Sequence, residues 1–351
     1  MHNIDKLKNF LKESKLDAIL VSKNENLFYY AGFNEEGTYL LVTLDKSYLL
    51  VNSLVYSDAK NKCKNMEVIL VSNYFETVNE LLTSNGSNNI AFEKSLPYLG
   101  YERLKDATKV TLVPTYIDSI RMIKSSEEIK IIKKACRMAD KCYKHILGYV
   151  KVGMSEKEIE KEMHRYLKEL GASKEAFDFI VASGKRGALP HGRASNKKIK
   201  KGELVTLDFG CFYHSYCSDM TRTFALDKTN EKLVNIYNLV KEANELAISL
   251  VRPGIRVNYL HNEVSLFFKK HNMDQYFIHN LGHGLGLEVH EEPRISPSSE
   301  TLLQEGMIIT IEPGLYIEGL GGVRIEDVVL VTKDGCEVLT KSSKELISVT
   351  K

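Results

Sequence analysis

Over the first 118 residues, apolar runs of strand length alternate with segments of helical spacing. Ile4, Leu7 and Leu11 recur on one face of a helix. Six apolar runs predict short strands, at residues 17–22, 38–43, 47–52, 66–71, 89–93 and 110–114. Only a hairpin-length gap separates the second run from the third. This alternation is typical of an α/β domain with a largely buried sheet.

A second unit begins near residue 120, where the apolar spacing becomes that of long helices. Two capping boxes predict helix starts, Ser125 with Glu128 and Ser155 with Glu158. Gly171 predicts the end of the second helix, and residues 230–250 predict a third. Since 351 residues are many for a single core, we expect two domains, residues 1–120 and 121–351.

The second unit carries one helix-then-strand pattern twice. Aligning Gly153 with Gly254 matches the apolar helix positions that follow them. Residues 202–210 then align with residues 306–314 after a small insertion. Two such copies would form a pseudo-symmetric shell, and the alternative is that short apolar runs align by chance.

Each copy ends its apolar strand in an acid, Asp208 in ELVTLDFG and Glu312 in MIITIEPG. A lone buried carboxylate is costly, and it takes up a proton sooner than it stays charged. Two acids at the same place in two copies suggest side chains that face each other and share a ligand.

Charge excludes one large class of function. The formal charge is +2 and the basic residues are mixed with acidic ones, which gives no electrostatic case for nucleic-acid binding. We interpret the basic run NKKIKK at residues 196–201 as a solvated turn rather than a phosphate-binding patch. No glycine-rich phosphate loop follows the predicted strands, so nucleotide binding has little support.

Targeting signals and cysteine usage indicate the cellular compartment in which the protein resides. The N-terminal segment is charged throughout, unlike a signal peptide, and no stretch approaches the ~20 apolar residues that cross a bilayer. The six cysteines show no CxxC spacing, which indicates reduced thiols and disfavours a cysteine-based zinc site. Cys211 and Cys217 are interpreted as buried, inert thiols. We therefore expect a cytoplasmic protein without a membrane partner.

Three further residues join the two acids as candidate metal ligands: Asp219 in SDMTRT, His283 in GHGLGLEVH and Glu326 in GGVRIED. We expect two hairpins and a loop to supply the four carboxylates and the imidazole. This set suits a pair of divalent cations, because carboxylates bridge two ions and the ions keep buried acids ionised. Each residue alone has an ordinary alternative: a turn acid for Asp219, a backbone-bonded loop histidine for His283, and an ion pair with Arg324 for Glu326.

The motifs LDFG, SDMTRT, GHGLGLEVHE, IEPGLY and GGVRIED together resemble those of the pita-bread metallopeptidases, the family of prolidase, aminopeptidase P and methionine aminopeptidase. Residues 1–118 resemble the creatinase-like domain that the first two carry. The resemblance implies an α/β N-terminal creatinase-like domain followed by an α+β pseudo-symmetric pita-bread catalytic domain. It also implies that two metal ions are bound by Asp208, Asp219, His283, Glu312 and Glu326, with Asp219 and Glu326 in contact with both.

Two histidines fall at positions where the family has imidazoles that contact substrate, His191 in LPHGRAS and His290 in GLEVHEEP. An imidazole can donate a hydrogen bond to the anionic intermediate of amide hydrolysis, or move a proton near neutral pH. His279 is a candidate for the pocket lining, and Arg294 and Arg324 could pair with a substrate carboxylate. Backbone hydrogen bonds or structural ion pairs are the alternatives for these side chains.

The resemblance implies a metal-dependent exopeptidase that hydrolyses the bond between an N-terminal residue and proline, with Glu312 moving the proton. Mn²⁺ is favoured, with Co²⁺, Zn²⁺ or Fe²⁺ as alternatives. The expected partners are peptides with proline at the second position and a second copy of the chain in a homodimer.

Dipeptides, the substrates of prolidase, are slightly preferred over the longer peptides of aminopeptidase P, because compact prolidases have this length. Two rival functions come from different classes of protein, a metal-free creatinase-like hydrolase and a non-catalytic peptide-binding protein. Both fit poorly with a complete ligand set.

Overall fold

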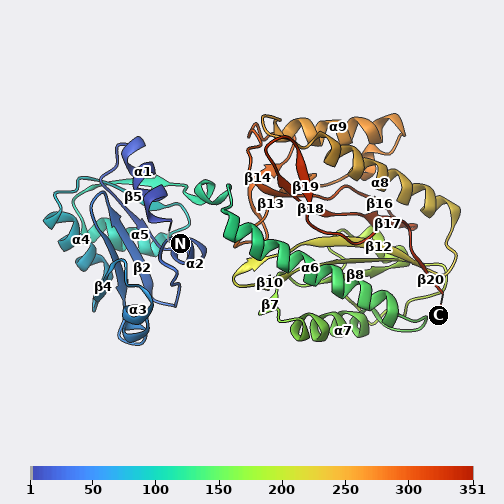
Figure 1. Ribbon diagram of the computed structural model, residues 1–351, viewed down its shortest axis with the longest axis horizontal. Helices are drawn as coiled ribbons and strands as arrows, with labels where there is room; N and C mark the ends of the chain where they lie inside the picture. The colour runs from blue at the N-terminus through green and yellow to red at the C-terminus, as the bar shows by residue number, and fades with distance from the viewer. Residues whose placement is uncertain (1–2, 351) are drawn as a thin grey trace. The chain divides into compact units, whose positions relative to one another are not determined.

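The computed structural model describes residues 3–350, and the chain divides into two compact units, Met1–Ile120 and Arg121–Lys351 (Figure 1). Each unit has its own layers of helix and sheet. No helix within residues 3–350 has the length and apolar character needed to span a membrane.

The first unit is built on a six-stranded mixed sheet with the strand order β4-β3-β2-β1-β5-β6. Its strands are β1 Ala18–Val21, β2 Thr38–Thr43, β3 Ser47–Val51, β4 Glu67–Leu70, β5 Asn89–Glu93 and β6 Thr111–Thr115. Its helices are α1 Ile4–Glu13, α2 Asn24–Ala31, α3 Tyr56–Lys62, α4 Tyr74–Ser84 and α5 Tyr98–Ala107, and η1 Asp118–Arg121 follows at the boundary. All six predicted strands are confirmed, and β2 and β3 form the predicted antiparallel hairpin.

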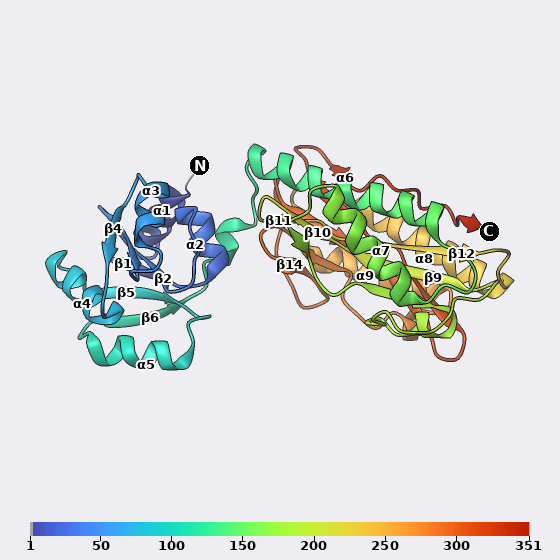
Figure 2. The same ribbon diagram turned by 90° about the horizontal axis from the view of Figure 1, so that it is seen from below.

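Side chains of the sheet alternate between its two faces, as the period of a strand requires. Ala18 and Leu20 of β1 pack in one apolar cluster with residues of α4 and α5, which Figure 2 shows on one side of the sheet. The expectation of a largely buried sheet is correct for β1, β2, β3 and β5 but wrong for β4 and β6. These two are edge strands, so one side of each has no neighbouring strand.

Four long helices cover the second unit: α6 Ser126–Tyr149, α7 Glu156–Glu169, α8 Glu231–Leu250 and α9 Val257–Lys270. Both predicted capping boxes are present, since the Ser125 and Ser155 hydroxyls accept from the third helical amides and the glutamates bond back. The short 3-10 turns are η2 Gly184–Ala188 and η3 Asp274–Tyr276.

The strands of the second unit form several sheets, in which neighbouring strands are antiparallel except for β20, which runs parallel to β12. One has the order β20-β12-β9-β8, and another has the order β14-β13-β15-β18-β19. Their strands are β8 Ile180–Ser183, β9 Leu204–Phe209, β12 Met220–Leu226, β13 Gly282–Gly284, β14 Glu291–Ile295, β15 Ile308–Ile311, β18 Asp327–Val331, β19 Cys336–Val338 and β20 Ser348–Val349. A three-stranded sheet in the order β11-β10-β7 and the pair β16-β17 complete the unit. These strands are β7 Lys174–Glu175, β10 Cys211–Tyr213, β11 Tyr216–Cys217, β16 Gly314–Ile317 and β17 Gly321–Arg324.

Two apolar clusters divide the second unit into halves. Buried residues of α6 and α7 pack on β8, β9 and β12. Buried residues of α8 and α9 pack on β15, β17 and β18. The helix pair of each half is visible in Figure 1, so each half is one layer of helices against one sheet.

The internal duplication read from the sequence is present in the backbone. Gly153 and Gly254 both have a left-handed φ, of 88° and 82°. Each donates its amide N–H to the carbonyl of a residue far along its own copy, Ile199 at 2.9 Å and Leu303 at 2.8 Å. The helices that follow, α7 and α9, have 14 residues each. The two halves are therefore structural repeats.

The last described strand ties the C-terminal segment back into the repeat. β20 runs parallel to β12, with Ser348 beside Ala225 and Val349 beside Leu226. This pairing makes β20 the edge strand of the sheet that carries β9.

Candidate metal centre

Two antiparallel strand pairs place the four candidate acids. Asp208 lies on β9, and Asp219 immediately precedes β12, the strand that pairs with it. In the second repeat Glu312 immediately follows β15, and Glu326 immediately precedes β18. Each pair of acids therefore meets at the same end of its strand pair, as the duplicated pattern predicted.

His283 lies on the strand β13, between β14 and β15, so its expected position in a loop is wrong. The residues on both sides of it, Gly282 and Gly284, must be glycines because the flanking strands approach them closely. A Cβ on Gly282 would lie 2.0 Å from the carbonyl oxygen of Thr310, and a Cβ on Gly284 would lie 2.1 Å from that of Glu292. The glycines allow a central strand to carry a histidine between two crowded neighbours.

These elements bring the candidate ligands together. Among the described residues, Asp219, His283 and Glu326 have ligand atoms within 4.8 Å of one another. His283 Nε2 also lies 3.3 Å from Glu312 Oε1 and 3.7 Å from Asp219 Oδ2. His283 Nδ1 lies 3.0 Å from the carbonyl oxygen of Gly284, which orients the ring with Nε2 toward the acids.

Asp208 belongs to the same cluster through its electrostatics. It shares the cavity wall with the other four residues. Burial and the nearby Glu312 charge raise the pKa of the Asp208 carboxyl, against the opposing charge of Arg324. Burial and the neighbouring carboxylates also raise the pKa of Asp219 and of Glu326 well above the ordinary values.

The cluster therefore gathers more buried acids than the neighbouring cationic side chains can keep ionised. Asp208 Oδ1 and Asp219 Oδ1 are buried and accept no hydrogen bond from any described residue. A buried carboxylate oxygen without a hydrogen-bond partner costs free energy, and a bound divalent cation removes that cost. The donor set of four carboxylates and one imidazole fits a pair of hard or borderline divalent ions.

Glu312 differs from the other three acids. Burial acts to raise its pKa, but the hydrogen bond and charge of His283, with further contributions from His279 and Arg324, hold the pKa below the ordinary value. Glu312 is therefore ionised and can accept a proton.

Threonine hydroxyls hold both glutamates, and the sequence reasoning missed them. Thr221 Oγ1 donates to Glu326 Oε2 at 2.8 Å, and Thr310 Oγ1 donates to Glu312 Oε1 at 3.4 Å. The backbone N–H of His283 donates to Thr310 Oγ1 at 3.1 Å. A signal was present, because a threonine stands two residues from a candidate ligand in both DMT and TIE.

A cavity of about 650 Å³ opens beside the cluster. The second unit lines it with all five candidate ligands and with the other predicted site residues: His191, His279, His290, Arg294 and Arg324. The ring centroids of His290 and His283 are 4.3 Å apart. Burial and the adjacent His283 lower the pKa of His290 to about 4, so its imidazole is neutral at neutral pH. The structure thus brings every predicted site residue to one cavity.

The two predicted arginines have different surroundings. Arg294 is exposed at the cavity wall. Arg324 is buried, and it donates to Asp208 Oδ2 at 2.5 Å and to Tyr316 Oη at 2.7 Å. The alternative in which Arg324 pairs with Glu326 is wrong, because its guanidinium faces Asp208.

Tyr316 was not singled out in the sequence, although it follows the IEPG motif. Its hydroxyl lies 2.9 Å from His279 Nε2 as well as accepting from Arg324. Tyr316 therefore links a histidine of the cavity wall to the ion pair of Asp208. Apolar side chains outside the quoted motifs, among them Phe177 and Ile180, also line the wall.

Groups interpreted as inert are so in the structure. Cys211 and Cys217 are buried and form no disulfide, and burial raises the pKa of both thiols. In the basic run, Lys197 pairs with Glu203 and Lys198 with Glu158, so these charges are neutralised locally.

Comparisons with known proteins agree with this geometry. Residues 130–333 match metallopeptidase family M24, and residues 3–123 match the creatinase/prolidase N-terminal domain. The chain is 42% identical over 349 residues to the Xaa-Pro dipeptidase of Pyrococcus horikoshii, with 98% of each chain covered.

Solved structures match over the whole length. The Xaa-Pro dipeptidase from Bacillus anthracis superposes with a TM-score of 0.95 at 37% identity, covering 98% of both chains. The X-Pro aminopeptidase from Thermotoga maritima superposes with a TM-score of 0.90 at 31% identity, covering 99% of this chain and 100% of that one. Both units of the fold are therefore shared with enzymes of known structure.

Proposed function

Because this chain belongs to metallopeptidase family M24 and carries the creatinase/prolidase N-terminal domain, we propose that it is an Xaa-Pro dipeptidase that uses two divalent metal ions. The observation that carries the proposal is the cluster of five side chains around orphaned carboxylate oxygens at the cavity wall. Pita-bread architecture and membership of a metal-dependent peptidase family agree with it.

The proposed ligands are Asp208, Asp219, His283, Glu312 and Glu326. When bound there, two divalent ions supply Lewis-acid polarisation of the scissile carbonyl and activation of the attacking water. Oxygen-rich ligation favours Mn²⁺, with Co²⁺, Zn²⁺ and Fe²⁺ as alternatives.

Protein side chains carry the remaining steps. Glu312 is held ionised beside His283, so it takes up the proton of the attacking water and passes it to the leaving proline nitrogen. His290 and His191 face the same cavity, where an imidazole N–H can donate to the developing oxyanion. Tyr316 and His279 line the same cavity.

Of the two arginines predicted to bind substrate, Arg294 is the one to which we assign substrate orientation. Arg294 is exposed at the cavity wall, so its guanidinium can pair with the carboxylate that ends a dipeptide. Arg324 is engaged by Asp208 and Tyr316, which supports a role in holding Asp208 rather than in binding substrate.

A dipeptidase and an aminopeptidase P differ in the substrate length that they accept. The relatives include both kinds, since the Thermotoga maritima structure is of an X-Pro aminopeptidase. Identity over the full length is higher to the Xaa-Pro dipeptidases, which supports the dipeptide as the preferred substrate. The aminopeptidase activity is the second candidate.

Four peptides decide between these functions. The Mn²⁺-loaded protein is incubated with Ala-Pro, Gly-Pro, Ala-Ala and Ala-Pro-Ala, and an EDTA-treated sample is the control. We expect rapid hydrolysis of the two Xaa-Pro dipeptides only. Cleavage of Ala-Pro-Ala alone would assign an aminopeptidase P, and equal cleavage of Ala-Ala would remove the proline requirement. No turnover of any peptide would favour a peptide-binding protein or a metal-free hydrolase.

Two further parts of the proposal concern the protein in the cell. The six cysteines form no disulfide within residues 3–350, which supports a reducing, cytoplasmic location. A homodimer is expected from the family resemblance, and light scattering of the purified protein tests it.

A further inference from the structure

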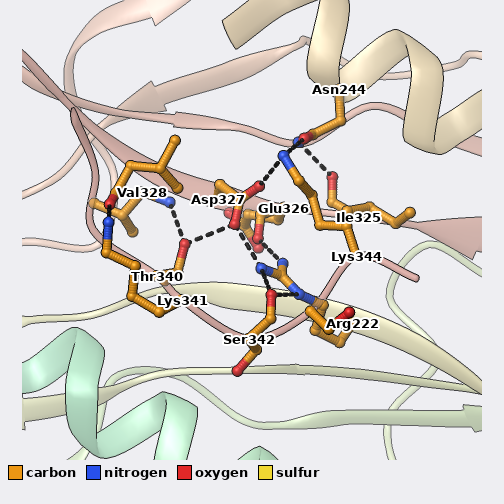
Figure 3. A network of polar contacts seen from close by, with 12 residues as sticks. Arg222, Asn244, Ile325, Glu326, Asp327, Val328, Thr340, Lys341, Ser342 and Lys344 are labelled. Atoms are coloured by element: carbon orange, nitrogen blue, oxygen red, sulfur yellow. Dashed lines mark hydrogen bonds and ion pairs between the residues drawn. The ribbon is translucent and has the colours of Figure 1, made fainter. Parts of the chain in front are cut away.

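A buried polar network adjoins the proposed metal centre (Figure 3). Its side chains come from α8, from the strands β12 and β18 and from the C-terminal segment that leads to β20. None of its members lines the cavity apart from Glu326, so the proposed mechanism leaves the network without a role.

Asn244 of α8 connects this network to both glutamate ligands of the second repeat. The side chain is fully buried, and its Nδ2 donates to the carbonyl oxygen of Ile311 at 3.0 Å and of Ile325 at 3.3 Å. Ile311 directly precedes Glu312, and Ile325 directly precedes Glu326. One amide group thus fixes the backbone next to both proposed glutamate ligands, Glu312 and Glu326.

Lys344 of the C-terminal segment determines how that amide is turned. Its Nζ donates to Asn244 Oδ1 at 2.8 Å, so the oxygen faces the ammonium and the NH₂ group faces the two carbonyls. Lys344 also lies 3.2 Å from Asp327 Oδ2. A rotated amide would place an oxygen against two carbonyl oxygens, which is repulsive.

Arg222 holds the same backbone from β12. Its guanidinium is fully buried, and Nη1 donates to the carbonyl oxygen of Glu326 at 2.5 Å. Its Nη2 donates to Asp327 Oδ1 at 2.6 Å and to the carbonyl oxygen of Ser342 at 2.9 Å. The backbone on both sides of the Glu326 side chain is therefore bonded to buried donors.

We propose that Asn244, oriented by Lys344, is a positioning residue that sets the separation of the Glu312 and Glu326 carboxylates. This inference rests on the metal centre proposed above. Two ions bridged by carboxylates tolerate little change in ligand separation, and groups that orient metal ligands typically change metal affinity by 10- to 100-fold when mutated. The C-terminal segment then supports the proposed metal centre indirectly, through the contact of Lys344 with Asn244.

Asn244→Asp tests the donor with the least change of shape. The Asp oxygen that replaces Nδ2 faces the two carbonyls, while the other oxygen keeps Lys344 as an ion-pair partner. We expect binding of Mn²⁺, measured by calorimetry on the metal-free protein, to weaken by about 10- to 100-fold for at least one ion. Asn238→Asp, an exposed substitution on the same helix, is the control and should bind like the wild type.

Substitutions of Lys344 provide a second test, in which no core side chain is changed. Lys344→Met removes the donor to Asn244, and we expect Mn²⁺ affinity to fall by about tenfold. Lys344→Arg keeps a donor and a positive charge, so it should restore affinity to within about twofold of the wild type. The midpoint of thermal unfolding is measured for each variant with and without Mn²⁺.

The two measurements separate positioning from general stabilisation. A merely structural role would lower the midpoint equally with and without Mn²⁺ and leave Mn²⁺ affinity unchanged, and that result would overturn the inference. Equal affinity for Lys344→Met and Lys344→Arg would also overturn it. Wild-type protein that binds no Mn²⁺ would instead overturn the proposed metal centre, so the two failures are distinguishable.

Discussion

Arg324 and Asp208 form a buried ion pair in which Nη2 lies 2.5 Å from Oδ2. They come from different repeats, and the pair holds the proposed ligand Asp208 in place. Removing one side of a buried pair strands the other charge and costs about 3–5 kcal/mol. For Arg324→Met we expect a loss of this size in the unfolding free energy of the EDTA-treated protein, measured in urea.

The matched control for that variant is Arg256→Met. Arg256 is more than half exposed and pairs with the exposed Glu300, so its loss should cost about 0–1 kcal/mol. Equal effects of the two substitutions would show that the Asp208 pair contributes no more than a surface pair.

Replacing a proposed ligand should reduce metal content and activity together. In Asp219→Asn a neutral amide replaces a carboxylate with an oxygen within 4.8 Å of ligand atoms of both His283 and Glu326. We expect the protein to retain fewer than two Mn²⁺ per chain by elemental analysis, and hydrolysis of Ala-Pro to fall at least about 100-fold. Asp334→Asn, in an exposed turn, serves as the control. An unaltered rate in Asp219→Asn would count against the ligand set.

His290 should act on the reaction without acting on metal content. Because its imidazole faces the cavity, His290→Ala removes a donor to the oxyanion but no proposed ligand. The expected result is a fall in kcat of about 10²–10³ with an unchanged Mn²⁺ content. A change in KM alone would assign His290 to substrate binding instead.

The crowding around β13 makes a prediction about His283. In Gly284→Ala the new Cβ would meet the carbonyl of Glu292 at 2.1 Å, so the strands must separate. Forced expansion of a packed site costs about 1–3 kcal/mol, and here it also displaces the neighbouring imidazole. We expect lower thermal stability and weaker Mn²⁺ binding. Gly335→Ala, where no atom lies within 4 Å of the added Cβ, should change neither quantity.

Acid sensitivity should arise in part from Glu291. Burial acts to raise its pKa, but the charges of Lys124 and Arg121 outweigh burial and hold it below the ordinary value. A lowered folded-state pKa gives stability that is present above the ordinary value of about 4.3 and is lost as the pH falls through the lowered value. Glu291→Gln should therefore flatten the fall in unfolding free energy between about pH 5 and pH 3.

That prediction is checked by urea unfolding at a series of pH values. Glu300→Gln, at a carboxylate that is three-quarters exposed, provides the reference slope. A slope in Glu291→Gln as steep as in the wild type would show that Glu291 does not contribute to acid unfolding.

The features that the sequence predicted are those with a periodic or duplicated signal. Capping boxes define helix starts through bonds between residues three apart, so Ser125 and Ser155 could be read directly. The repeated strand-then-acid pattern pointed to Asp208 and Glu312 because the second copy supported the first. Motif resemblance then supplied the ligands that had no local signal of their own.

The features that were missed depend on distant contacts. Nothing near Arg324 in the sequence indicates that it faces Asp208, 116 positions away. His283 was expected in a loop because glycines usually mark turns, whereas here they mark a strand with crowded neighbours on both sides. The order of the strands in the first sheet likewise decides which of them lie at its edges. An apolar run such as residues 66–71 predicts a strand but carries no information about that order.

The parallel pairing of β20 with β12 has a consequence for how the catalytic unit is made. During translation the two repeats emerge one after the other, yet Lys344 and the strand Ser348–Val349, which bond to Asn244 and to β12, emerge last. A nascent chain that stops short of residue 340 therefore carries every proposed ligand but not the brace that supports them. From the positioning role proposed for Lys344, we expect tight metal binding only in chains whose synthesis has passed that point.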